Sequence, residues 1–118
     1  GRAREVLGAI VEREPEHAGA LAELGRSFLG EDLDRALALY ERAARHETWN
    51  GSLVAAQGLI LAQSGRFEDA RERTWEALRR DPEDGATWAI YARILAELGL
   101  DDDAREATAV VARTKRAR

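Results

Sequence analysis

The sequence has no cysteine and no methionine, and only two prolines and two histidines among its 118 residues. The absence of cysteine excludes disulfide bonds, thiolate nucleophiles and cysteine-ligated zinc. The histidines, His17 and His46, lie in different parts of the chain, so they do not form the paired ligands of a zinc-binding helix. No apolar run approaches the roughly 18 residues of a membrane-spanning helix. We therefore predict a protein without a metal site and without membrane insertion.

Residue patterns that serve catalysis are also missing. The serines are Ser27, Ser52 and Ser64, and none lies in the G-x-S-x-G motif that exposes a nucleophile. There is no glycine-rich loop that could cradle a phosphate. The three aspartates at 101–103 do not follow the spacing of an EF-hand calcium loop. We predict that the chain is not an enzyme and that it holds no cofactor.

The charged residues make up 34% of the chain and are spread along it, with a formal net charge of −4. Such a distribution is typical of solvated helix faces. A net negative charge also argues against a general nucleic-acid binder, because the phosphate backbone attracts basic surfaces. We expect no nucleic-acid partner.

The most informative positive feature is an internal repeat. A small residue recurs at Ala3, Ala36, Ala70 and Ala104, with spacings of 33, 34 and 34 residues. A period in this range, with helical patterning inside it, is typical of a solenoid built from pairs of helices. The chain therefore divides, as one domain over 1–118, into a half repeat and three full repeats: 1–17, 18–50, 51–84 and 85–118.

The first half of each repeat carries a stripe of residues at helical spacing i, i+3, i+4 and i+7. The third member of this stripe is Gly25, Gly58 or Ala92, which is small enough to let the paired helix approach closely. We expect Asn50 and Asp84 to cap helix N-termini, where their side chains can accept backbone hydrogen bonds. Gly65 and Gly99 stand where helices should end. Seven helices are predicted, over residues 2–13, 18–29, 33–46, 51–63, 67–80, 85–97 and 101–114.

These features resemble the tetratricopeptide repeat, a 34-residue pattern with a tryptophan, a leucine–glycine pair and a tyrosine in its first helix. Trp88 stands in the tryptophan position, and the resemblance covers the whole chain. It implies an all-α fold, a right-handed solenoid of antiparallel helix pairs, with a protein or peptide as partner. The second repeat fits best, with the following residues in register: Gly58, Gly65, Phe67, Ala70, Ala77 and Pro82.

Some residues depart from the family pattern. Gln57 stands where the family has leucine, and Thr74 stands where it has an aromatic residue. Trp75, the next residue, is a candidate for the bulk missing at Thr74, and it is also a candidate interface anchor. Trp49 lies in a turn, and we expect it to cover the joint between two repeats.

By the same resemblance, one stripe of the first helices faces a ligand groove. Leu59 would form its apolar floor, Ala55 and Ala89 would give room, and Arg26 and Arg93 would meet carboxylates of a bound peptide. An alternative interpretation is that the small residues only permit tight curvature and that the arginines are solvated. The nine residues of the predicted stripe are Ala22, Arg26, Leu29, Ala55, Leu59, Ala62, Ala89, Arg93 and Ala96.

Three functions are compatible with this pattern. The first is a non-catalytic module that binds a peptide or partner segment in the groove. The second is an assembly element that associates through its uncapped ends, where we expect Ala104 and Val111 to be exposed. The third is an accessory repeat domain of a larger enzyme. The chain begins inside an expected helix, so we interpret it as a fragment of a longer protein.

Overall fold

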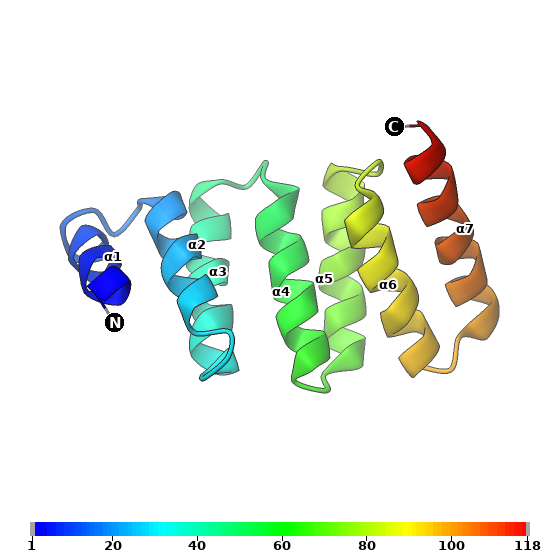
Figure 1. Cartoon of the computed structure of the whole chain (residues 1–118), viewed down its shortest axis with the longest axis horizontal. Coiled ribbons are helices and arrows are strands. Elements are labelled where there is room, and N and C mark those ends of the chain that lie inside the picture. Colours follow the sequence, from blue (N-terminus) through cyan, green and yellow to red (C-terminus); the bar gives the residue numbers. More distant parts are fainter. Residues whose placement is uncertain (1, 118) are drawn as a thin grey trace.

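The computed structural model describes the backbone of residues 2–117 and the side chains of residues 2–114. Every regular element in this part of the chain is a helix, so the predicted all-α solenoid is confirmed (Figure 1). Only two helix ends differ from the prediction, because α2 ends at Ser27 and α7 extends to Ala117. The helices are α1 (Arg2–Arg13), α2 (Ala18–Ser27), α3 (Leu33–His46), α4 (Gly51–Gln63), α5 (Phe67–Arg80), α6 (Gly85–Glu97) and α7 (Asp101–Ala117).

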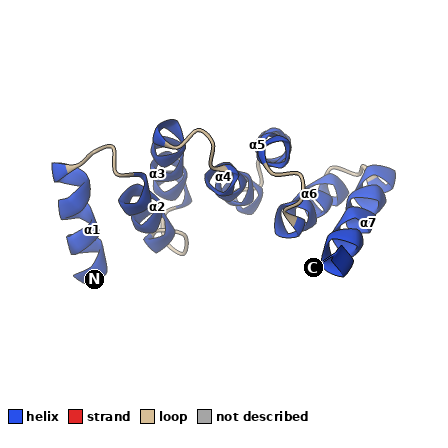
Figure 2. Cartoon of the chain, turned by 90° about the horizontal axis from the view of Figure 1, so that it is seen from above, coloured by secondary structure: helices blue, strands red, loops and turns tan. Residues whose placement is uncertain are grey.

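The helices stand side by side in one row, 47 × 29 × 22 Å in extent. The closest pairs are α2 with α3, α4 with α5, and α6 with α7. In Figure 1, α2, α4 and α6 form a front layer before α3 and α5, and Figure 2 shows the same two layers from above. Each pair contacts mainly its neighbours along the chain, so the core is continuous only through stacking.

The predicted helix ends follow from local hydrogen bonding. The Asn50 side chain accepts a hydrogen bond from the backbone N–H two residues on, at 3.0 Å, and Asp84 does the same at 3.1 Å. Gly65 and Gly99 have φ of +77° and +78°, a region that glycine adopts without steric cost. His17 is a cap that the sequence analysis missed: its Nδ1 accepts a 3.0 Å hydrogen bond at the start of α2.

Arg4 links α1 to the C-terminal end of α2 and to the turn that follows it. Its guanidinium carbon lies 4.0 Å from the centre of the Phe28 ring, and Arg35 lies over the same ring at 4.5 Å. Arg4 also donates hydrogen bonds to Ser27 Oγ at 3.1 Å and to the Glu31 carboxylate at 3.0 Å. This ion pair lowers the pKa of Glu31, since it favours the charged carboxylate.

Within the first two helix pairs, the helices approach each other closely at the predicted glycines. A Cβ placed on Gly25 would lie 3.1 Å from the ring of Tyr40, and a Cβ on Gly58 would lie 2.3 Å from Thr74 Oγ1. The Thr74 side chain is fully buried, and its hydroxyl donates to the Ala70 carbonyl at 2.7 Å. The helix spacing is nevertheless the same in the two pairs, because a Cβ would lie 3.3 Å from the Ala36 carbonyl oxygen at Gly25 and 3.4 Å from the Ala70 carbonyl oxygen at Gly58. The buried Thr74 hydroxyl, instead of an aromatic ring, therefore fills the space beside Gly58.

Two expectations about tryptophan are wrong. Trp75 does not supply bulk at Thr74, because it points toward the next repeat, where its ring centre lies 5.7 Å from that of Tyr91. Trp49 does not cover a joint between repeats, because it is 74% exposed. The turn that carries Trp49 leaves its side chain in solvent.

The expected exposure of Ala104 is also wrong. Ala104 is buried in a cluster with Ala92 and Leu95 of α6, and Val111 is half-buried. Among the side chains described, the large exposed apolar ones are Val6, Trp49 and Trp75, and of these Val6 is the one on a terminal helix. The ends of the row are therefore less apolar than the sequence analysis expected.

No helix in the described part of the chain combines the length and the hydropathy of a membrane span.

The contact between Gly58 and Thr74 predicts a specific loss of stability. Gly58→Ala should destabilise the fold by about 1–3 kcal/mol, because the added methyl group forces apart two closely packed helices. The measurement is urea unfolding followed by circular dichroism. The matched control is Gly8→Ala in α1, where an added Cβ meets nothing within 4 Å. This control should be neutral or stabilising by up to about 1 kcal/mol. Equal effects of the two substitutions would contradict the packing described.

Candidate functional site

Three residues of the predicted stripe gather in one cleft. Leu59 and Ala62 of α4 and Arg93 of α6 line a cavity of about 270 Å³ between these two helices. A cavity of this size is at the lower limit of small-molecule sites. It therefore suits one or two side chains of a partner rather than a whole ligand.

The remaining walls of the cleft are apolar below and polar at the rim. Ile90 and Ile94 lie one turn apart on α6, and Phe67 begins α5 just after the turn at Gly65. Ile94 is almost fully buried and packs in a core cluster, so it fixes the base of the cleft. Gln63 and Glu97 line the rim. The sequence prediction missed the three apolar residues, although Ile90 stands one turn before Arg93 and Ile94 directly after it.

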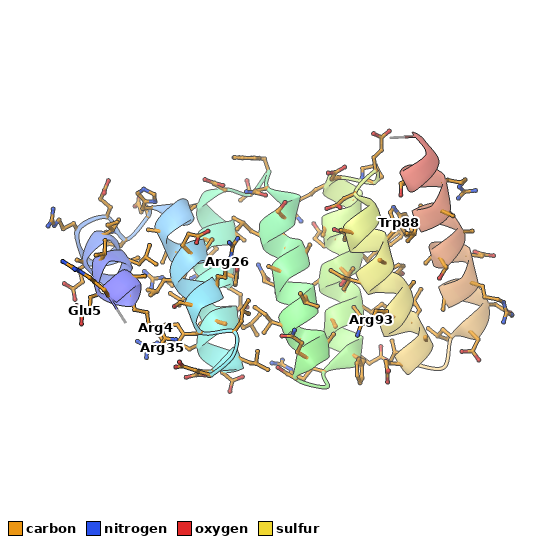
Figure 3. The ribbon with its side chains drawn as sticks, in the orientation of Figure 1. Arg4, Glu5, Arg26, Arg35, Trp88 and Arg93 are labelled. Carbon is orange, nitrogen blue, oxygen red and sulfur yellow. The ribbon has the colours of Figure 1, made fainter. Side chains whose placement is uncertain are left out.

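The two arginines of the stripe differ in their surroundings. Arg93 is exposed and makes no hydrogen bond or ion pair with any residue that the structure describes. Arg26 lies on α2, away from this cleft, and pairs with Glu23 of the same helix at 3.5 Å (Figure 3). Both side chains of that pair are more than half exposed, so the pair contributes little stability and can be broken by a partner.

The other stripe residues lie outside this cleft. Ala22, Leu29 and Ala89 are half-buried, and Ala96 is exposed. Ala55 is buried in a cluster with Val54 and Ala77, so it is closed off from the groove that it was expected to widen. The predicted stripe is therefore not one continuous surface, because three of its residues line the cleft and the others lie apart from it.

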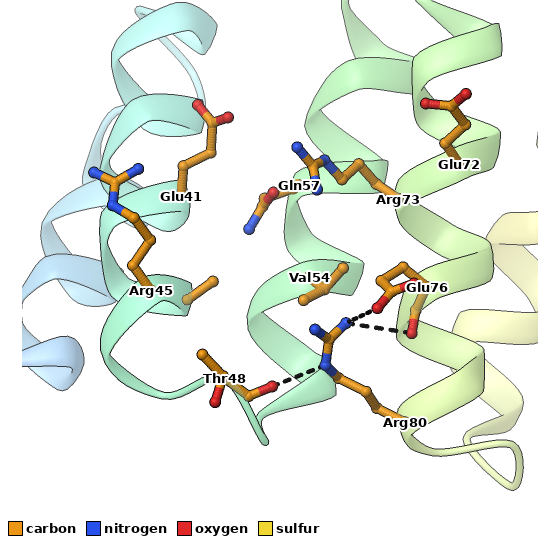
Figure 4. Close-up of a pocket in the computed structure, with 10 residues that line it drawn as sticks. Glu41, Arg45, Thr48, Val54, Gln57, Glu72, Arg73, Glu76 and Arg80 are labelled. Atoms are coloured by element: carbon orange, nitrogen blue, oxygen red, sulfur yellow. Dashed lines mark hydrogen bonds and ion pairs between the residues drawn. The ribbon is translucent and has the colours of Figure 1, made fainter.

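A second cleft, which sequence analysis missed, lies behind α4, between α3 and α5 (Figure 4). It has a volume of about 480 Å³ and is lined by as many arginines as glutamates. Arg80 is held in place by the Thr48 carbonyl at 2.8 Å and the Glu76 carboxylate at 2.9 Å. Gln57, in the position where the family has leucine, is buried at the floor and directs its amide into this cleft.

The family model of the tetratricopeptide repeat matches residues 1–52 and 55–117. No curated protein sequence matches the chain. Solved structures of MamA are similar in fold: one has a TM-score of 0.90 at 19% identity, covering 97% of this chain and 67% of its own.

Two further MamA structures agree with this. MamA MSR-1 has a TM-score of 0.84 at 20% identity, covering 98% of this chain and 67% of its own. The MamA RS-1 ArsTM double mutant has a TM-score of 0.90 at 20% identity, covering 98% of this chain and 66% of its own. This chain thus spans about two thirds of the length of these proteins, and the likeness concerns the fold.

In the cleft between α4 and α6, we expect the buried residue at the base to determine stability and the residues at the surface to contribute little to it. Ile94→Ala should destabilise the fold by about 2–5 kcal/mol, because it opens a cavity at the base of the cleft. Arg93→Gln and Leu59→Ser should each cost at most about 1 kcal/mol, since the first side chain is exposed and the second half-buried. Urea unfolding measures all three. A large loss from Arg93→Gln would show that Arg93 has a structural role, contrary to the geometry.

Proposed function

This chain belongs to the tetratricopeptide repeat family, and we propose that it binds a peptide segment of a partner protein in the cleft between α4 and α6. Repeats of this family form protein-interaction modules, and the module proposed here is non-catalytic. The observation that carries the proposal is that an unpaired guanidinium, that of Arg93, lies at the rim of a cavity with an apolar floor of Leu59 and Ile94. Glu97 lines the same rim one turn further along α6 and does not pair with Arg93.

The chemistry of the cleft suits a particular kind of segment. An apolar side chain of the partner would enter between the helices and displace water from Leu59 and Ala62. An acidic side chain or a terminal carboxylate beside it would accept hydrogen bonds from Arg93, whose planar guanidinium matches a carboxylate in geometry. Arg26 on α2 would add a second carboxylate contact once its weak pair with Glu23 is exchanged.

The alternatives have less support. Assembly through the uncapped ends would need apolar end faces, and among the described side chains α1 presents Val6 whereas α7 buries Ala104. A role as the accessory domain of a larger enzyme would place the chemistry in other segments of a longer protein. Both alternatives predict that substitutions in the α4–α6 cleft leave binding unchanged.

The proposal predicts that a partner is lost when the cleft is changed. Wild-type chain, the double variant Leu59→Ser/Arg93→Gln and the control Arg73→Gln serve as baits in a lysate of the source cells. Arg73 is an exposed arginine of the cleft behind α4, so this control removes the same charge from the opposite side. A partner of the proposed kind should be captured at least about tenfold less by the double variant, as expected for a loss of about 1.4 kcal/mol.

The control should capture as much partner as the wild type. Circular dichroism spectra of the three baits must agree, so that a difference reflects the surface and not the fold. Equal capture by the double variant, or equal loss with Arg73→Gln, would contradict the proposed site.

A further inference from the structure

The outer side of the last repeat carries a third cleft, of about 600 Å³, over α6 and between α5 and α7. Its position repeats that of the cleft behind α4, since Tyr91 here occupies the floor position that Gln57 occupies there. It lies on the opposite side of α6 from Arg93. It is therefore independent of the function proposed above.

The floor of this cleft is aromatic. Trp75 of α5 and Trp88 of α6 both pack against Tyr91, with ring centres 5.7 Å and 5.9 Å from that of Tyr91. Trp88 is fixed by a 2.7 Å hydrogen bond that its indole N–H donates to the Pro82 carbonyl. Trp75 is 48% exposed although it lies in a packed cluster, so part of its ring surface is open to a partner.

The wall of the cleft is acidic. Asp103 and Glu106 of α7 line it, and neither forms an ion pair or a hydrogen bond with a residue that the structure describes. Burial is the main cause that raises the pKa of Tyr91, and the Asp103 carboxylate raises it further, which places that charge near the phenol. Two arginines face the cluster: Arg113 lines the cleft, and Arg71, which lowers the Tyr91 pKa, is already paired with Glu68 at 3.3 Å.

We propose that this cleft between α5 and α7 binds an arginine side chain of a basic polypeptide segment, with the guanidinium stacked on the exposed ring of Trp75 and hydrogen-bonded to Asp103 or Glu106. A planar cation gains from both contacts at once, because the face of an indole ring and a carboxylate each attract it. The chain already stacks guanidinium groups on an aromatic ring elsewhere, where Arg4 and Arg35 flank Phe28. The unpaired carboxylates determine the sign of the partner's charge, and the flat aromatic surface favours arginine over lysine.

The test uses the whole chain and two blocked tetrapeptides, acetyl-Gly-Arg-Arg-Gly-amide and its glutamine analogue, titrated at low salt. Binding is followed by the shifts of backbone amide signals in NMR spectra, which do not depend on any tryptophan. The arginine peptide should give saturable shifts centred on α5, α6 and α7, and the glutamine peptide should give none. Absence of saturable shifts, or equal shifts with the glutamine peptide, would overturn the proposal.

Three variants show whether the site is the one proposed. Trp75→Ala and the double variant Asp103→Asn/Glu106→Gln should each weaken binding about fivefold or more, as expected from the loss of about 1 kcal/mol for one such contact. Asp101→Asn/Asp102→Asn is the control, since it removes the same charge from the same helix outside the cleft. If this control weakened binding equally, the peptide would be held by general electrostatic attraction only. If Trp75→Ala bound the peptide as the wild type does, the aromatic cluster would have a packing role and would not form the binding site.

The outcome is separable from that of the α4–α6 cleft. Arg93→Gln should leave binding of the arginine peptide unchanged, because Arg93 lines the other cleft. If Arg93→Gln abolished it, the peptide would be bound elsewhere and the proposed site would be wrong.

Discussion

The close approach of α4 and α5 at Gly58 is the constraint on which the rest of the structure depends. A Cβ at this position would lie 2.3 Å from the Thr74 hydroxyl, so no residue larger than glycine fits there unless Thr74 or its helix moves. This approach sets α5 in place, and a cluster of Leu61, Ala70 and Ile94 then joins α4, α5 and α6. Because Ile94 also forms the base of the α4–α6 cleft, the geometry of that cleft follows from the packing of the pair before it.

The same repeated geometry produces surfaces of different chemistry. One floor position is occupied by Leu24 in the first repeat, Gln57 in the second and Tyr91 in the third, and each of these residues lines a cleft between successive outer helices. Small residues inside the pairs maintain the fold, so the residues that face these clefts are free to differ. Specificity in such a scaffold resides in the lining residues rather than in the fold.

Much of the fold could be predicted from the sequence, because the residues that begin and end helices recur at the same positions in successive repeats. Asn50, Asp84, Gly65 and Gly99 determine helix ends through contacts within a few residues, and these predictions are confirmed. Contacts between repeats could not be predicted in this way. Trp75 packs on Tyr91 and not beside Thr74 because of how one helix pair is rotated against the next. The residue pattern of a single helix carries no information about that rotation.

The candidate site shows the same division. Sequence analysis found Leu59, Ala62 and Arg93, but it treated Arg26 and Ala55 as equal members of the groove. The structure separates them, because the α4–α6 cleft is lined by Leu59, Ala62 and Arg93, whereas Arg26 lies on α2 and Ala55 is buried in a separate cluster. A double-mutant cycle between Gly58→Ala and Thr74→Ala tests the central packing claim most directly. The account predicts that Gly58→Ala costs at least about 1 kcal/mol less when Thr74 is alanine, whereas additive effects within about 0.5 kcal/mol would contradict it.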